Sequence, residues 1–142
     1  MTIPTSHQPW GPFEELTPTE CLNLLHAKNI GRVAMCGPTG PQVFPVNYTM
    51  HDGCVLFRTA PYTLMARQLR DDRAAFEVDD IDDYLKCGWS VLVVGDAAHV
   101  EELPEEIAAG HAEGPEPWIG DDRPLYIRIR PIGITGRRVH PH

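Results

Sequence analysis

The chain alternates between apolar and polar residues most regularly near its C-terminus. From Leu125 to Arg130 every second residue is Leu or Ile, and the residues between them are Tyr or Arg. Because the side chains of a strand point alternately to its two faces, this segment predicts a strand with one face in the core. We expect the strand to continue past two glycines to Val139. Less regular patterns predict five further strands, at residues 32–36, 42–50, 54–59, 74–78 and 89–100.

A strong helix start signal lies at Thr17-Pro18-Thr19-Glu20. These four residues supply a capping hydroxyl, a proline in the first turn and the glutamate of a capping box. Apolar residues follow at helical spacing, and Gly31 suits the left-handed position that often ends a helix. The pattern therefore predicts a helix from this start to about Asn29. Two shorter helices are predicted at residues 61–70 and 104–112.

Turn residues join the predicted strands into antiparallel hairpins. Asp52-Gly53 is a two-residue hairpin signal, and residues 79–83 predict a solvated acidic loop. Pro45 lies inside a predicted strand and removes a ladder donor, so we expect that strand to be bulged or at a sheet edge there. Antiparallel strands with a few short helices predict a mainly β fold of six or so strands, closed into a barrel because closure removes exposed edges.

Length and charge narrow the class of protein. The 142 residues predict one domain at 14–139, with a flexible N-terminal arm at 1–13 and a tail at 140–142. A net charge of −8 argues against a nucleic-acid partner, because phosphate contacts need clustered Lys and Arg. Residues 1–12 lack the charged and apolar regions of a signal peptide, and no apolar run approaches the ~20 residues of a membrane helix, so we expect no membrane contact and a cytoplasmic location. Four scattered cysteines predict bland, reduced thiols.

A group suited to an anion stands where a predicted strand gives way to a predicted helix. Arg58 can fork onto phosphate oxygens, and the Thr59 and Thr63 hydroxyls with the first helical amides could complete a cradle. The alternative is that Thr59 only caps the helix and Arg58 pairs with one of the many acids. The residues alone leave both open.

Two other segments could face a planar ring. Unpaired backbone groups around Pro45 and the amide of Asn47 could meet the polar edge of a flavin, although a plain edge strand explains them as well. Trp89 could stack on a ring or fill the core, and Ser90 beside it is equally ambiguous.

The remaining charged clusters leave the function open. Part of an arginine cluster near the C-terminus could face an anionic substrate or a neighbouring subunit, or form a solvated strand face; its members are Arg128, Arg130, Arg137 and Arg138. The acidic run at 79–83 lacks the glycine and terminal glutamate of a calcium loop, so we expect no metal site.

A series of short motifs carries more information than any one of them. In order, they are Pro45-Val46-Asn47-Tyr48, Asp52-Gly53, Phe57-Arg58-Thr59, Phe76-Glu77-Val78-Asp79 and Gly88-Trp89-Ser90-Val91. This series resembles the pyridoxamine 5'-phosphate oxidase-like superfamily over about residues 14–139. More narrowly, it is similar to the small FMN-binding members, which include the nitroimidazole-resistance proteins.

The resemblance implies an FMN-binding split β-barrel that forms homodimers, with the flavin at the dimer interface. The cofactor-binding residues would be Pro45, Val46, Asn47, Tyr48, Arg58, Thr59, Thr63, Arg67, Trp89 and Ser90. The chain departs from the family where relatives often carry a glycine and a lysine, since Tyr62 and Leu64 stand in those places and Arg67 would have to compensate. That departure leaves room for a deazaflavin, for haem or for an empty groove.

The implied activity is an FMN-dependent oxidoreductase. It would transfer a hydride or electrons to a small, planar or nitroaromatic substrate, and the cofactor would carry the chemistry, so we predict no protein nucleophile. The alternative is a non-catalytic protein that binds or sequesters a flavin, a deazaflavin or haem.

Overall fold

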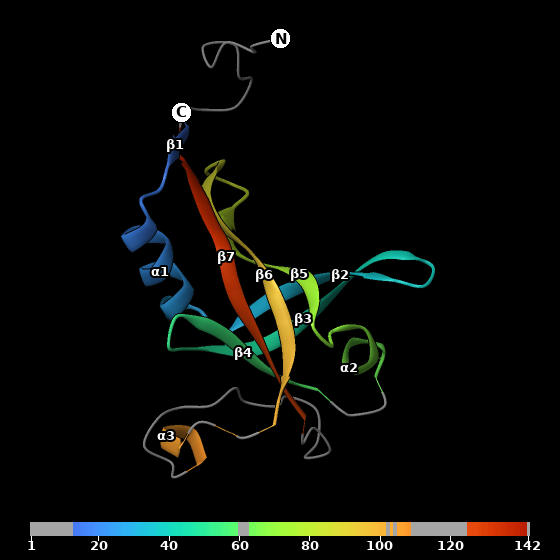
Figure 1. The fold of residues 1–142 in the computed structure, drawn as a ribbon. Coiled ribbons are helices and arrows are strands. Elements are labelled where there is room, and N and C mark those ends of the chain that lie inside the picture. Colours follow the sequence, from blue (N-terminus) through green and yellow to red (C-terminus); the bar gives the residue numbers. More distant parts are fainter. Residues whose placement is uncertain (1–12, 60–62, 102, 104, 109–124, 142) are drawn as a thin grey trace.

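The computed structural model describes residues 13–59, 63–101, 103, 105–108 and 125–141. These residues form seven strands and three helices (Figure 1). In chain order they are β1 (Phe13–Glu15), α1 (Pro18–Ala27), β2 (Ile30–Gly37), β3 (Gly40–His51), β4 (Cys54–Thr59), α2 (Leu64–Gln68), β5 (Asp72–Asp82), β6 (Cys87–Val100), α3 (Glu105–Ala108) and β7 (Leu125–Val139).

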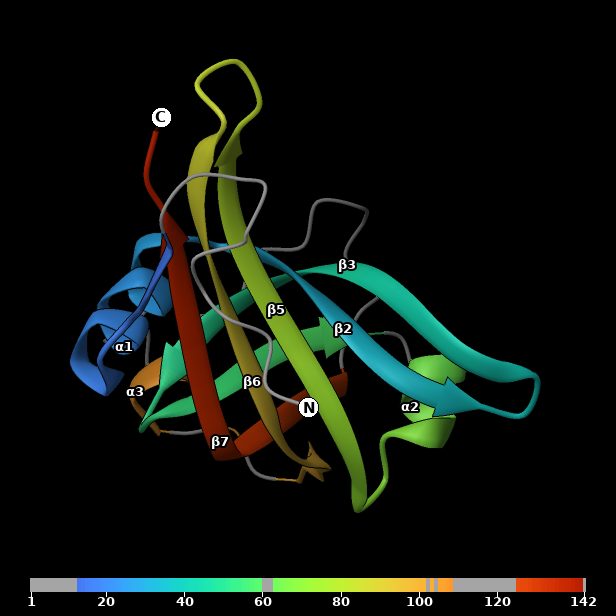
Figure 2. The same cartoon turned by 90° about the horizontal axis from the view of Figure 1, so that it is seen from above.

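Six of the strands close into an antiparallel barrel. The sheet order is β1-β7-β4-β3-β2-β5-β6, and β6 also pairs with β7, so the ring is complete. Ile129 of β7 shows the closure, because it pairs with Val55 of β4 on one side and with Ala97 of β6 on the other. The predicted mainly β split-barrel fold is confirmed. In both views α1 and α2 lie on opposite sides of the barrel (Figures 1 and 2).

Apolar side chains from every barrel strand fill the interior. The largest fully buried ones include Phe57, Phe76, Leu25 and Leu69. Helix α1 covers one end through Cys21 and Leu25, which are 1% and 0% exposed. The capping box at its start forms as predicted, since the Glu20 amide donates to the Thr17 hydroxyl and the Thr17 amide donates to the Glu20 carboxylate.

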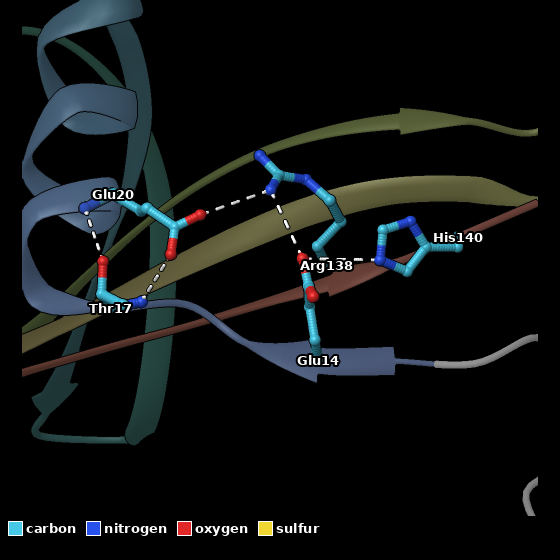
Figure 3. A network of polar contacts seen from close by, with 5 residues as sticks. All are labelled: Glu14, Thr17, Glu20, Arg138 and His140. Atoms are coloured by element: carbon cyan, nitrogen blue, oxygen red, sulfur yellow. Dashed lines mark hydrogen bonds and ion pairs between the residues drawn. The ribbon is translucent and has the colours of Figure 1, made fainter.

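A polar network holds β1 and α1 against the end of β7 (Figure 3). The Arg138 guanidinium lies 3.6 Å from both the Glu14 and the Glu20 carboxylate, and His140 Nε2 lies 3.4 Å from Glu14. Hydrogen bonds from the Thr17 amide and hydroxyl, with the Arg138 charge, hold the pKa of Glu20 below its ordinary value. The network explains one arginine of the C-terminal cluster as structural.

The structure confirms two local predictions, a hairpin turn and a sheet edge. Asp52 and Gly53 have φ angles of 49° and 74°, the left-handed values that a type I′ hairpin requires. The β3–β4 ladder ends at Tyr48, so within the described residues the Pro45 segment of β3 pairs with β2 alone. The predicted sheet edge at Pro45 is therefore confirmed.

Three predictions were wrong. Gly31 lies in β2 instead of ending the helix, and a Cβ there would overlap the ring of Phe76. The acidic run continues β5 as far as Asp82, with each residue paired to β6, so the turn comes later. Helix α2 is shorter than predicted, since Thr63 is its N-cap. Of the two shorter predicted helices, residues 61–62, 104 and 109–112 lie outside the described part of the chain.

Candidate functional site

Arg58 lies on the outer wall of the barrel near the end of β4. Its neighbours Phe57 and Thr59 are both 0% exposed, so they point into the core and Arg58 points outward, half-buried. Its guanidinium carbon lies 5.4 Å from the ring centroid of Tyr126, the residue opposite it on β7. A cation over an aromatic face is attracted by the ring, so Tyr126 restricts where the guanidinium points.

The two threonines near Arg58 bond to each other. The Thr59 and Thr63 hydroxyl oxygens lie 2.8 Å apart, and the Thr63 hydroxyl accepts a hydrogen bond from the Ala66 amide at 3.2 Å. Thr63, and not Thr59, is thus the helix cap. The side chain of Thr59 faces the core, whereas Thr63 is only half-buried. Arg67 lies on the exposed side of α2.

The segment from Pro45 to Tyr48 divides between the two faces of β3. Val46 and Tyr48 are 7% and 2% exposed and belong to the core. The Tyr48 hydroxyl donates to the Leu25 carbonyl at 2.6 Å, and burial raises the pKa of this phenol. Pro45 and Asn47 point outward. The side chains of Pro45 and Asn47 are therefore the ones in this segment that can meet a ligand on the outer wall.

Asn47 and Arg58 lie one residue beyond the last pair of the β3–β4 ladder. Tyr48 pairs with Phe57, so Asn47 and Arg58 are next in the same register and on the same outer face. A hollow of about 280 Å³ lies on the β2 side of Pro45, and neither Asn47 nor Arg58 lines it; its lining residues are Lys28, Asn29, Ile30, Arg32, Pro45 and Asp79. The sheet edge at Pro45, an amide and a cation thus share one part of the wall.

Trp89 and Ser90 are on β6 and point in opposite directions. Trp89 packs against the hydrophobic core, which is one of the two roles considered for it from the sequence. Ser90 faces outward into a groove of about 730 Å³. The groove is lined by Phe13, Glu15, Leu16, Pro18, Glu77, Ser90, Leu92, Ile134, Thr135, Gly136 and Arg137. Its volume is in the range of small-molecule sites.

The Ser90 groove and the Arg58 wall do not meet in one protomer. Through β7, the β6 residue level with Arg58 is Val100, because both pair with Tyr126. Val100 is ten positions after Ser90, or about 30 Å along an extended strand. Side chains at these two places therefore cannot surround the same ring within a single chain.

Glu77 is a titratable residue that lines the groove, and it was not among the site residues predicted from the sequence. Arg32 Nη1 lies 3.4 Å from the Glu77 carboxylate and 3.2 Å from that of Asp79. Burial and the nearby Asp79 carboxylate together raise the pKa of Glu77 to about 7, and Arg32 only partly opposes them. The motif Phe76-Glu77-Val78-Asp79 contained the signal, since alternation places both acids on one face.

Glu77 should make stability depend on pH. Its pKa is 4.5 in the unfolded chain and about 7 in the fold, so its stabilising contribution is complete below pH 4.5 and is lost as pH rises through 7. We compare the unfolding free energies of Glu77→Gln and wild type at pH 4.5 and at pH 8. The difference between the two proteins should shift by about 1 kcal/mol in favour of the variant at pH 8. This value is discounted for solvent screening because the side chain is 35% exposed. Urea unfolding at both pH values measures this.

The matched control for that experiment is Glu105→Gln, which changes an exposed glutamate of α3. It should follow the wild-type pH dependence. If Glu77→Gln also follows the wild-type curve, the carboxyl of Glu77 does not titrate differently in the fold.

Two general findings concern the whole described part of the chain. Its helices include none long and apolar enough to cross a membrane. Its His, Cys, Asp and Glu side chains form no group of three or more that could hold a metal ion.

Comparison with known proteins decides the family. The family model for pyridoxamine 5'-phosphate oxidase matches residues 17–138, which run from the cap of α1 almost to the end of β7. The chain belongs to this family. The resemblance that the ordered motifs predicted is therefore confirmed.

One curated protein and two solved structures are similar to this member of the family. An uncharacterised protein of Mycobacterium tuberculosis is 33% identical over 130 residues, covering 88% of this chain and 84% of its own. The FAD binding protein from Mycobacterium smegmatis has a TM-score of 0.70 at 30% identity, covering 91% and 100% of the two chains. A candidate pyridoxamine 5'-phosphate oxidase from Corynebacterium glutamicum has a TM-score of 0.75 at 33% identity, covering 91% and 99%.

Proposed function

We propose that this chain is an FMN-dependent oxidoreductase that acts as a homodimer, with each flavin held between two copies. The observation that carries the proposal is the half-buried Arg58 beside Asn47 and the sheet edge at Pro45, in a chain of this family. A guanidinium suits the flavin phosphate, and an amide suits the donors and acceptors of the ring edge. The Mycobacterium smegmatis relative, a FAD binding protein, supports a flavin as the ligand.

The separation of the site residues supports a dimer. Arg58 and Asn47 of one copy could hold the phosphate and ring edge, while the groove at Ser90 of a second copy covers the ring. The outer wall near that groove exposes apolar side chains, with Leu92 at 41%, Val94 at 37% and Ile132 at 59%. Contiguous exposed apolar surface is typical of an interaction site, and a second copy of the chain is the partner we assign to it.

The residues of the chain would bind and orient the cofactor. Arg58 would neutralise the phosphate, Tyr126 would hold Arg58 in place, and the apolar side chains of the groove would keep water from the ring. A bound flavin supplies hydride or one-electron transfer. The substrate we propose is a small planar or nitroaromatic molecule that can stack on the ring. A cytoplasmic location fits the four cysteines, all of which are free thiols.

The absorption spectrum of the purified protein tests the proposal. We expect a yellow protein that releases FMN on denaturation, loses its colour with a nicotinamide donor and regains it with a nitroaromatic acceptor. Titration with FMN, FAD, riboflavin, a deazaflavin and haem would rank the ligands. A protein that binds none of the flavins would contradict the proposed function.

One observation favours the non-catalytic alternative. Leu64, at the place where relatives often carry a lysine, packs against the hydrophobic core and supplies no charge. A weaker phosphate site would suit a protein that binds flavin without turning it over. Bound flavin that no donor reduces, or that no acceptor reoxidises, would select this alternative.

A further inference from the structure

A second arginine lies next to Arg58 on the outer wall of the barrel. Ile127 and Ile129 are 0% exposed and point into the core. The alternate residues of β7, Tyr126 and Arg128, therefore point outward, and each of these two is half-buried. Tyr126 pairs with Arg58, and Arg128 pairs with Leu56, which is on the same face of β4 as Arg58 and is 2% exposed. Arg128 is therefore the diagonal neighbour of Arg58, at a typical backbone spacing of about 7–8 Å.

Arg128 is half-buried, and within the described residues it makes no ion pair. Five other cations are each within ion-pair distance of a carboxylate: Lys28, Arg32, Arg73, Lys86 and Arg138. In a protein with a net charge of −8, a half-buried arginine that makes no ion pair with the described residues and lies next to a second arginine is suited to bind an anion.

We infer that Arg128 is the second phosphate-binding cation of the flavin site and that Tyr126 is a positioning residue for Arg58. This inference rests on the proposed function. Two guanidiniums on adjacent strands can each donate two hydrogen bonds to one phosphate, and the dianion removes the repulsion between them. The charge missing at Leu64 is thus supplied from β7. Arg67, which lies on the exposed side of α2, does not have this role.

The test compares FMN with riboflavin, which has the same ring and no phosphate. Dissociation constants would be measured by flavin fluorescence for the wild-type protein and for Arg128→Gln. We expect Arg128→Gln to weaken FMN by about ten-fold or more and to leave riboflavin unchanged. The control is Arg130→Gln, which removes the same charge from the next outward position of β7 and should leave both ligands within about two-fold.

The remaining variants address the rival residue and the positioning role. Arg67→Gln should leave FMN affinity unchanged. Tyr126→Leu should weaken FMN about three-fold with riboflavin unchanged, and Tyr126→Phe should restore the wild-type value because it keeps the ring. An unchanged ratio of FMN to riboflavin affinity in Arg128→Gln, or a loss in Arg67→Gln in its place, would overturn the inference while leaving flavin binding intact. A wild-type protein that binds no flavin would overturn the proposed function as well.

Discussion

Phe76→Ala should lower the free energy of unfolding by about 3–5 kcal/mol. Phe76 is 0% exposed, and its ring meets that of Tyr48 edge to face, with centroids 4.6 Å apart and planes at 66°. The ring edge lies against Gly31, where the neighbouring strand has no side chain. Truncation would leave a cavity that the closed barrel cannot collapse to fill, so both the transfer energy and the packing of Tyr48 are lost.

Urea unfolding at pH 7 measures this loss. Tyr84→Ala is the matched control, because Tyr84 is 91% exposed at the β5–β6 turn and its truncation should change stability by less than about 0.5 kcal/mol. If Phe76→Ala is too unstable to purify, Phe76→Leu should still lose about 1–1.5 kcal/mol. If Phe76→Ala and Phe76→Leu are both as stable as wild type, the barrel interior is not packed around this ring.

Arg58→Ala should weaken FMN binding by about 1.5–3 kcal/mol, which is roughly 10- to 150-fold in dissociation constant. The loss comes from charge-assisted hydrogen bonds to the phosphate, so riboflavin binding should change far less. Removal of the guanidinium also leaves Tyr126 without its cation partner, at a small cost in stability.

Isothermal titration with both ligands separates these effects. Arg73→Ala is the control, because Arg73 is exposed and its guanidinium forms an ion pair with Asp96 on the neighbouring strand. It should bind FMN as wild type does. A folded Arg58→Ala protein with wild-type FMN affinity would remove Arg58 from the cofactor site and with it the main support for the proposed function.

Most strands were predictable because their signals are local. The alternation between Leu125 and Arg130 locates β7, and Asp52-Gly53 fixes the hairpin whose second strand, β4, was predicted with the observed bounds. The prediction of an acidic loop failed because a run of aspartates lowers strand propensity. That propensity is outweighed by the β5–β6 hairpin, in which Asp79 pairs with Ser90 and Asp82 with Cys87.

The candidate site was only partly accessible from the sequence. Alternation would have placed Tyr48 and Thr59 in the core, since each shares a face with an apolar neighbour two positions away, Val46 and Phe57. The resemblance grouped them with Arg58 regardless of direction. The neighbourhood of Arg58 and Arg128 could not have been predicted, because it depends on the β4–β7 register across about 70 residues of chain.

A complementation experiment tests the central claim, that one flavin is bound by two copies of the chain. Arg58→Ala and Ser90→Trp should each abolish tight FMN binding alone, the first at the phosphate and the second by filling the groove. When the two variants are co-expressed, each mixed dimer has one site with an intact Arg58 from one copy and an intact Ser90 from the other. Counting FMN bound per chain should then recover about a quarter of the wild-type sites. No recovery, from mixed dimers shown to have formed, would contradict the account and place both residues' roles within a single chain.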